Sequence, residues 1–190
     1  MHANFDRAFE KTMGNEGGYS NNPADRGGET YRGISRKSWP LWSGWEKIDK
    51  VRQDPGFPEI VKYLQLEQDV KQFYRRLFWD EIHGDMIPSQ SVAEKLFDFA
   101  VNAGVKTTVK FMQESLNVLN LKGARWEDID VDGNMGPATM RAVASCVKKY
   151  EDVLLTMFSG RMINHYYQIM CNDQSQECFA INWIRRAVKA

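Results

Sequence analysis

Most of this 190-residue chain repeats its apolar residues at the spacing of an α-helix, and this periodicity most limits the folds open to it. The first segment with this spacing is residues 5–13, and Asn4 and Gly14 are suited to cap its two ends. Ser91 and Glu94 have the spacing of a capping box at the start of SVAEKLFDFAVNAG, which is apolar on more than one face. Pro137 is suited to the first turn of a later helix. We therefore predict a mainly α fold with a buried central helix.

Two stretches interrupt the helical pattern. The first, residues 13–35, reads MGNEGGYSNNPADRGGETYRGIS and contains too many glycines and other breakers for a helix. Because Gly27-Gly28 can turn the chain and TYRGI can be extended, we predict a short hairpin within 20–35. The second, residues 40–58, contains prolines and the tryptophans Trp42 and Trp45, and we interpret it as an irregular surface excursion.

The overall composition excludes several functional classes. Twenty-five Lys and Arg residues balance twenty-five Asp and Glu residues, whereas a nucleic-acid-binding protein usually has a basic excess, so no nucleic acid partner is expected. The chain has no run of eighteen apolar residues, which predicts no integral membrane segment. The charged N-terminal residues do not resemble a classical signal peptide, so we expect synthesis in the cytoplasm without one. No pattern in the sequence specifies an oligomeric state.

Cysteines and histidines give no sign of a cofactor. The three cysteines have no regular spacing, which favours reduced thiols over a disulfide framework. The alternative is that Cys171 and Cys178 pair if the protein leaves the cell. The three histidines lack partners at ligand spacing, so we predict no zinc site. Residues 128–139 begin like an EF-hand, but Thr139 replaces the required glutamate, so we expect no metal and no cofactor.

Two carboxylates of the 13–35 stretch have unlike surroundings. Glu16 follows the first helix and precedes two glycines, and the nearby rings of Tyr19 and Tyr31 would desolvate it and raise its pKa. Asp25 lies in polar NNPADRGG, where water and Arg26 favour its charged form. A carboxylate pair in unlike environments is what acid–base cleavage of a glycosidic bond requires. The alternative is that Glu16 is a solvated helix end and Asp25 an ordinary turn residue.

The stretch NEGGYSNNPADRGGETYRGIS resembles the signature of the bacterial and phage N-acetylmuramidases of glycoside hydrolase family 108, some of them first described as secretion activators. The segments YRRLFWDEIHGD and LFDFAVNAG are also similar to this family. The resemblance implies a lysozyme-like helical fold with a small irregular or β-hairpin active-site loop. It also implies that Glu16 is catalytic. By similarity to phage-type lysozymes, Asp25 and Thr30 take the second and third catalytic places, with a slightly shorter interval between them.

This resemblance implies hydrolysis of the β-1,4 bond between N-acetylmuramic acid and N-acetylglucosamine in peptidoglycan glycan strands, at the cell wall or in the periplasm. We expect sugar contacts from Tyr19, Tyr31 and Asn102. For Asn102, a helix end with Gly104 as the stop is an equal alternative. Two other functions stay open. One is a lytic transglycosylase, and the other is a non-enzymatic wall-binding protein that assists secretion.

The second half of the chain has its own motif. VKFMQESLNVLN followed by DVDGNMGPATMRAV resembles the helical peptidoglycan-binding module, whose repeated positions are filled by Asp132, Gly133, Gly136, Pro137 and Thr139. These residues by themselves indicate only structure, because Asp-Gly turns the chain and Gly-Pro starts a helix. We predict a catalytic lobe at 1–84 and a peptidoglycan-binding-like lobe at 85–190, packed on the first.

Overall fold

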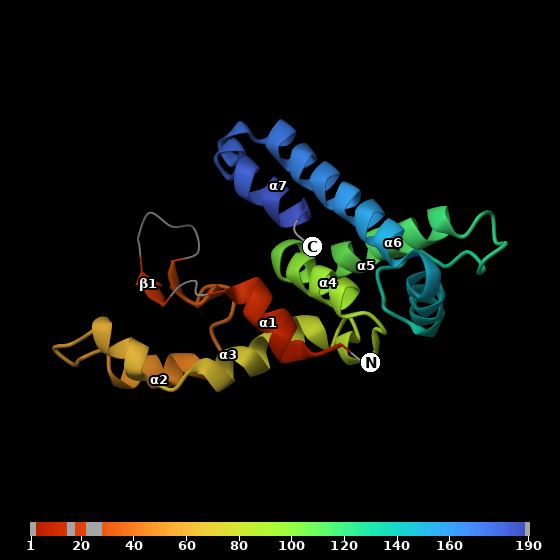
Figure 1. The fold of residues 1–190 in the computed structure, drawn as a ribbon. Coiled ribbons are helices and arrows are strands. Elements are labelled where there is room, and N and C mark those ends of the chain that lie inside the picture. The colour runs from red at the N-terminus through yellow and green to blue at the C-terminus, as the bar shows by residue number, and fades with distance from the viewer. Residues whose placement is uncertain (1–2, 15–17, 22–27, 189–190) are drawn as a thin grey trace. The chain divides into compact units, whose positions relative to one another are not determined.

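The computed structural model describes residues 3–14, 18–21 and 28–188 and confirms a mainly α fold (Figure 1). The helices are α1 (Phe5–Met13), α2 (Gly44–Lys50), α3 (Glu67–Tyr74), α4 (Gln90–Ala103), α5 (Val105–Leu119), α6 (Pro137–Asn172) and α7 (Ala180–Val188). Short 3-10 or π segments are η1 (Glu59–Tyr63), η2 (Arg75–Trp79), η3 (Gly84–Met86) and η4 (Gln174–Phe179). None of the helices in the described ranges has the length and apolar character needed to cross a bilayer.

The chain forms two compact units. The first unit consists of Met1–Ala8 together with Phe78–Ala190, and the second unit of Phe9–Leu77. The functional division into lobes 1–84 and 85–190 stays a prediction.

Both ends of helix α1 are capped as its sequence predicts. The Oδ1 of Asn4 accepts a hydrogen bond from the backbone N–H of Arg7 at 2.9 Å. At the other end, Gly14 has a φ of +51°, and its N–H donates to the carbonyl of Glu10 at 3.0 Å. Asn4 is therefore the N-cap, and Gly14 takes the left-handed conformation that ends a helix at low cost.

The predicted hairpin is present and has a third strand. Strands β1 (Tyr19–Asn21), β2 (Glu29–Tyr31) and β3 (Ile34–Ser35) form an antiparallel sheet in the order β1-β2-β3. The two-residue turn between β2 and β3 has a φ of +44° at Arg32 and +80° at Gly33. Positive φ at both positions gives the turn a twist that matches the strands it joins. TYRGI is therefore extended only at its two ends and turns at Arg32-Gly33, and Gly27 of the predicted Gly27-Gly28 turn lies outside the described residues.

Trp42 and Trp45 are buried, so the interpretation of 40–58 as a surface excursion is wrong for this part. The ring of Trp42 stacks on Tyr31 at 5.9 Å between centroids and meets Trp45 edge-on at 5.1 Å. Each indole N–H donates to a backbone carbonyl, which removes the cost of burying a polar group. A side chain at Gly44 would overlap the Trp42 ring, so the start of α2 packs directly against it.

Helix α4 is the buried central helix of the first unit, but it begins before the predicted capping box. Ser89 is the N-cap, because its Oγ accepts from the N–H of Val92 at 3.2 Å, and the same Oγ donates to Glu151 at 2.7 Å. Glu94 instead pairs with Arg7 at 3.0 Å. The capping box at Ser91 is therefore wrong, because partners distant in sequence engage Ser89 and Glu94.

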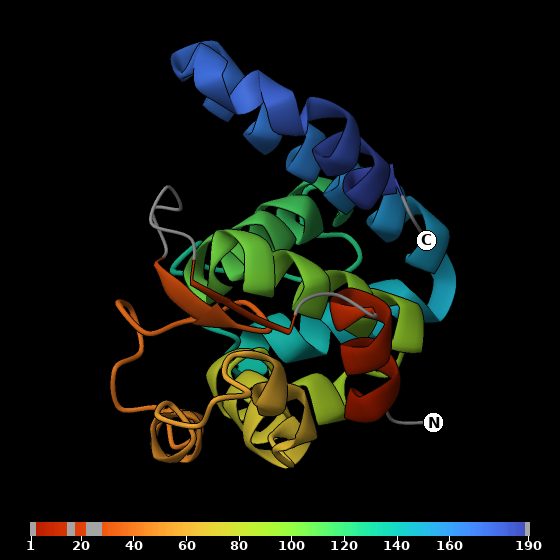
Figure 2. The ribbon, with the colours of Figure 1, turned by 90° about the vertical axis from the view of Figure 1, so that its left-hand side faces the viewer.

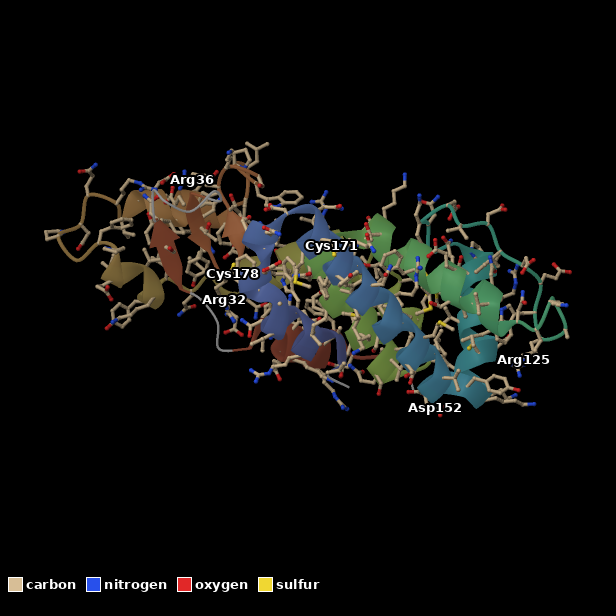
Figure 3. The ribbon with its side chains drawn as sticks, turned by 90° about the horizontal axis from the view of Figure 1, so that it is seen from above. Arg32, Arg36, Arg125, Asp152, Cys171 and Cys178 are labelled. Carbon is tan, nitrogen blue, oxygen red and sulfur yellow. The ribbon has the colours of Figure 1, made fainter. Side chains whose placement is uncertain are left out.

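Helix α7 lies alongside α6 in the first unit, as both views show (Figure 1, Figure 2). Pro137 begins α6 at its first turn, as predicted, and Tyr150 interrupts the helix with a φ of −137°. Tyr166 of α6 stacks on Trp183 of α7 at 5.1 Å. Cys146 is buried, whereas Cys171 and Cys178, near the junction of α6 with η4, are exposed (Figure 3); all three are thiols.

Candidate active site

The predicted site residues divide between the described and undescribed parts of the chain. Glu16 and Asp25 lie outside the described residues; in chain order they fall between α1 and β1 and between β1 and β2. Tyr19, Thr30 and Tyr31 come together on the adjacent strands β1 and β2. Asn102 is in α4, in the other compact unit.

The strand register separates these residues by face. Tyr19 is opposite Tyr31, and Asn21 is opposite Glu29, so these four side chains share one face of the sheet. Thr30 is opposite Ser20 on one side and Ser35 on the other, which places its hydroxyl on the second face. Thr30 is half-buried, and its Oγ1 donates to the carbonyl of Gly28 at 3.1 Å. The hydroxyl of Thr30 is therefore held at the end of the β1–β2 connection.

Both tyrosines of this sheet make packing contacts. Tyr31 is 8% exposed, and burial raises its pKa. Tyr19 is half-buried, meets Phe57 edge-on at 5.1 Å, and donates from its hydroxyl to Oε1 of Glu29 at 2.9 Å. Burial also raises the pKa of Tyr19. Sugar contacts by Tyr19 and Tyr31 stay predictions.

Glu29 is the centre of an ionic cluster that the sequence did not reveal. Its side chain is only 12% exposed and pairs with Arg36 Nε at 2.7 Å and with Arg52 Nη2 at 2.6 Å. Both guanidinium groups also bind Asp49 of α2, Arg36 at 2.7 Å and Arg52 at 2.9 Å. We call Glu29, Arg36, Asp49 and Arg52 the arginine clamp; Arg36 is marked in Figure 3. The clamp ties strand β2 to helix α2.

The clamp residues also pack against aromatic rings. The guanidinium of Arg36 lies 4.5 Å from the centre of the Trp45 ring, and that of Arg52 lies 5.4 Å from the Phe57 ring. Arg36, and then Arg52, hold the pKa of Asp49 below its usual value. Glu29 comes from β2 and Asp49 from α2, whereas Arg36 and Arg52 lie in the turns that follow β3 and α2, so no single segment contains the whole clamp.

Helix α3 holds the β2–β3 turn in place. The hydroxyl of Tyr74 donates to the carbonyl of Arg32 at 2.9 Å, and burial raises the pKa of Tyr74 to about 12. A Cβ at Gly33 would lie 2.7 Å from this hydroxyl. Gly33 is therefore required both by its positive φ and by the approach of Tyr74.

Gly104 ends α4, and Asn102 is held by a side chain from α6. Gly104 has a φ of +86°, and its N–H donates to the carbonyl of Ala100 at 2.9 Å, so the predicted helix stop is confirmed. Asn102 is exposed, and its Oδ1 accepts a hydrogen bond from the Tyr166 hydroxyl at 2.8 Å. A sugar contact by Asn102 stays a prediction.

The Asp-Gly and Gly-Pro motif of the second half is organised by buried Gln113. Its Nε2 lies within hydrogen-bond distance of Asp132 Oδ1 (2.8 Å), the Asn134 carbonyl (3.0 Å) and Thr139 Oγ1 (3.1 Å). Its Oε1 accepts from the N–H of Gly133 at 2.9 Å. These contacts give the motif a structural role. Across the described ranges, no three His, Cys, Asp or Glu side chains gather into a metal-binding group.

The chain is mostly helical and has a small antiparallel sheet after its first helix. This architecture is that of a mainly α, lysozyme-like protein. Residues 9–104 match the model of the family described as Glycosyl hydrolase 108, and the chain belongs to that family. Residues 107–188 match a second model, described as Predicted Peptidoglycan domain. The chain is thus a glycoside hydrolase, and the second match supports peptidoglycan as its substrate.

The fold is also similar to that of a solved protein. The structure of SagA from Brucella abortus superposes with a TM-score of 0.59 at 23% sequence identity, covering 97% of this chain and 93% of that chain. At this identity the likeness concerns the fold alone. Comparison with curated proteins gives no match.

Proposed function

We propose that this protein is an N-acetylmuramidase, a lysozyme that hydrolyses the β-1,4 bond between N-acetylmuramic acid and N-acetylglucosamine in peptidoglycan. One observation carries the proposal: the match to glycosyl hydrolase 108 spans the stretch that contains Glu16, Asp25 and Thr30. The match to the peptidoglycan domain supports the same polymer as substrate. The protein would act at the cell wall or in the periplasm, where this polymer lies.

In this mechanism Glu16 is the general acid. Its carboxylic acid donates a proton to the glycosidic oxygen as the bond to the anomeric carbon breaks and positive charge develops on the sugar ring. A water molecule attacks that carbon, and the Asp25 carboxylate accepts the proton that the water loses. Thr30 assists by holding this water. The arginine clamp and the hydrogen bond from Tyr74 of α3 to the β2–β3 turn keep its strand in place.

A turbidity assay on purified sacculi tests the assignment of Glu16. The wild type is expected to clear the suspension, and Glu16→Gln is expected to lose about two to four orders of magnitude in rate, because an amide cannot donate the acid proton. Circular dichroism checks that the variant is folded. Near-normal clearance by folded Glu16→Gln would contradict the proposal.

Mass spectrometry of the digest separates hydrolysis from the alternatives. A muramidase leaves reducing N-acetylmuramic acid ends, whereas a lytic transglycosylase leaves 1,6-anhydro ends because no water enters. A protein that only binds the wall releases neither product. Reducing ends in the wild-type digest are the expected result.

A further inference from the structure

Tyr166 is almost fully buried, yet its hydroxyl bonds to an exposed side chain. The residue is 1% exposed, and the hydroxyl donates to Oδ1 of Asn102 at 2.8 Å. Asn102 is exposed in the last turn of α4, which Gly104 ends. The hydrogen bond therefore joins a residue inside the first compact unit to an amide on its surface.

The ring of Tyr166 is held firmly. It stacks on Trp183 at 5.1 Å between centroids, with 22° between the ring planes, and meets Phe99 edge-on at 6.0 Å. Burial raises the pKa of Tyr166 to about 12, so the hydroxyl keeps its proton at any physiological pH. The donor position is therefore constant, and only the amide of Asn102 could turn.

A fixed donor selects one orientation of an asparagine amide. The two ends of the amide differ, since the oxygen accepts and the nitrogen donates two hydrogen bonds. With Oδ1 facing the Tyr166 hydroxyl, Nδ2 faces away from it. The acetamido carbonyl of an N-acetylhexosamine is an acceptor of the matching kind, and every sugar of a peptidoglycan strand carries one.

We propose that Tyr166 is a positioning residue that orients the Asn102 amide so that Nδ2 donates to the acetamido carbonyl of a bound sugar. The inference rests on the proposed function, because it takes N-acetylated glycan as the substrate. Asn102 lies in the region that matches glycosyl hydrolase 108, whereas Tyr166 lies in the region that matches the peptidoglycan domain. The second region thus contributes to sugar recognition by a residue of the first.

The test measures binding in the Glu16→Gln background, where hydrolysis is suppressed. The probe is the β-1,4-linked tetramer of N-acetylglucosamine, and isothermal titration calorimetry gives its dissociation constant. Asn102→Ala is expected to weaken binding about 3- to 10-fold, the usual effect of one neutral hydrogen bond. Tyr166→Phe is expected to weaken it about 2- to 5-fold by releasing the amide. Because both act through one contact, the double variant is expected to bind no more weakly than Asn102→Ala alone.

Two further variants make the test specific. Asn102→Asp still accepts from Tyr166 but has no N–H to donate, so it is expected to bind as weakly as Asn102→Ala. Asn172→Ala changes another exposed asparagine at a helix end and is expected to bind normally. Thermal melts followed by circular dichroism check folding, and if Tyr166→Phe does not fold, the Asn102→Asp result decides.

Three results would overturn the proposal: normal binding by folded Tyr166→Phe, normal binding by Asn102→Asp, or losses that add in the double variant. A purely structural hydrogen bond between α4 and α6 would change the melting temperature and leave the dissociation constant unaffected. Failure of the proposed function appears separately, as clearance of sacculi by Glu16→Gln.

Discussion

Glu29 shows how a carboxylate next to a proposed catalytic residue can have a structural role. It lies beside Thr30, and its charge makes it a natural candidate for the second catalytic carboxylate if Asp25 is not one. Its two oxygens, however, pair with Arg36 and Arg52, and the Tyr19 hydroxyl adds a third contact. A carboxylate neutralised in this way is poorly placed to activate water.

We predict that Glu29→Gln destabilises the protein without abolishing activity. The amide keeps the shape but removes one of the two carboxylates that the partly buried guanidinium groups of Arg36 and Arg52 share, which is expected to cost about 1–3 kcal/mol in the free energy of unfolding. Turnover on sacculi is expected to stay within about tenfold of the wild type, far above Glu16→Gln. Urea unfolding and the turbidity assay measure the two effects. A folded Glu29→Gln as inactive as Glu16→Gln would make Glu29 catalytic.

At the scale of elements, the loop between α5 and α6 illustrates how local contacts make the stability of the protein depend on pH. The pKa of Asp132 is lowered to about 2, first by the backbone N–H of Asn134 and then by the Gln113 amide and the Asn134 side chain. An unfolded aspartate titrates near 3.9. Because the folded pKa is lower, the resulting stability is fully present above about pH 4 and is lost as the pH falls towards 2.

We therefore predict that Asp132→Asn reduces the acid dependence of the melting temperature between about pH 4 and pH 2. The Oδ1 of the asparagine can still accept from the Gln113 amide and the backbone N–H of Asn134. Its Nδ2 cannot accept from the Asn134 side chain, and the residue has no charge to lose. Melting curves at several pH values compare it with the wild type, and Asp130→Asn, an exposed neighbour in the same loop, is the control. Identical pH dependence in Asp132→Asn and wild type would contradict the role of this carboxylate.

At the scale of the whole molecule, the boundaries of the matched regions and of the compact units differ. The two family matches meet between residues 104 and 107, which is where α4 ends and α5 begins, inside the first compact unit. Helix α4 of the first match packs with helices of the second. Lys95 of α4 is 7% exposed, and its Nζ donates to the carbonyl of Ala187 in the last turn of α7 at 2.8 Å. A lysine there also complements the negative end of the helix dipole.

We predict that Lys95→Met loosens α7. Methionine can replace the aliphatic stem but not the donor, so unfolding is expected to become easier by about 1–3 kcal/mol. Amide hydrogen exchange in 180–188 is expected to accelerate more than exchange in α4. The matched control is Lys148→Met, which changes an exposed lysine of α6. If hydrogen exchange accelerated equally along the whole chain, Lys95 would support general stability and would have no specific link to α7.

The sequence by itself determined the features that depend on neighbouring residues. Helical periodicity predicted the mainly α fold, Asn4, Gly14 and Pro137 predicted helix ends, and the glycines of 13–35 predicted the hairpin. The signature of that stretch also indicated the family. Each of these signals is local, because a cap, a turn or an amphipathic face is specified within a few residues.

Only the tertiary structure decided which polar and aromatic groups meet across long sequence separations. It paired Glu29 with Arg36 and Arg52, buried Trp42 and Trp45, bonded Ser89, the N-cap of α4, to Glu151, and joined Tyr166 to Asn102. The physical reason is that a charge or an indole N–H is buried at low cost only where another element of the fold supplies its hydrogen-bond or ion-pair partner. The spacing of residues within one segment does not predict such a contact.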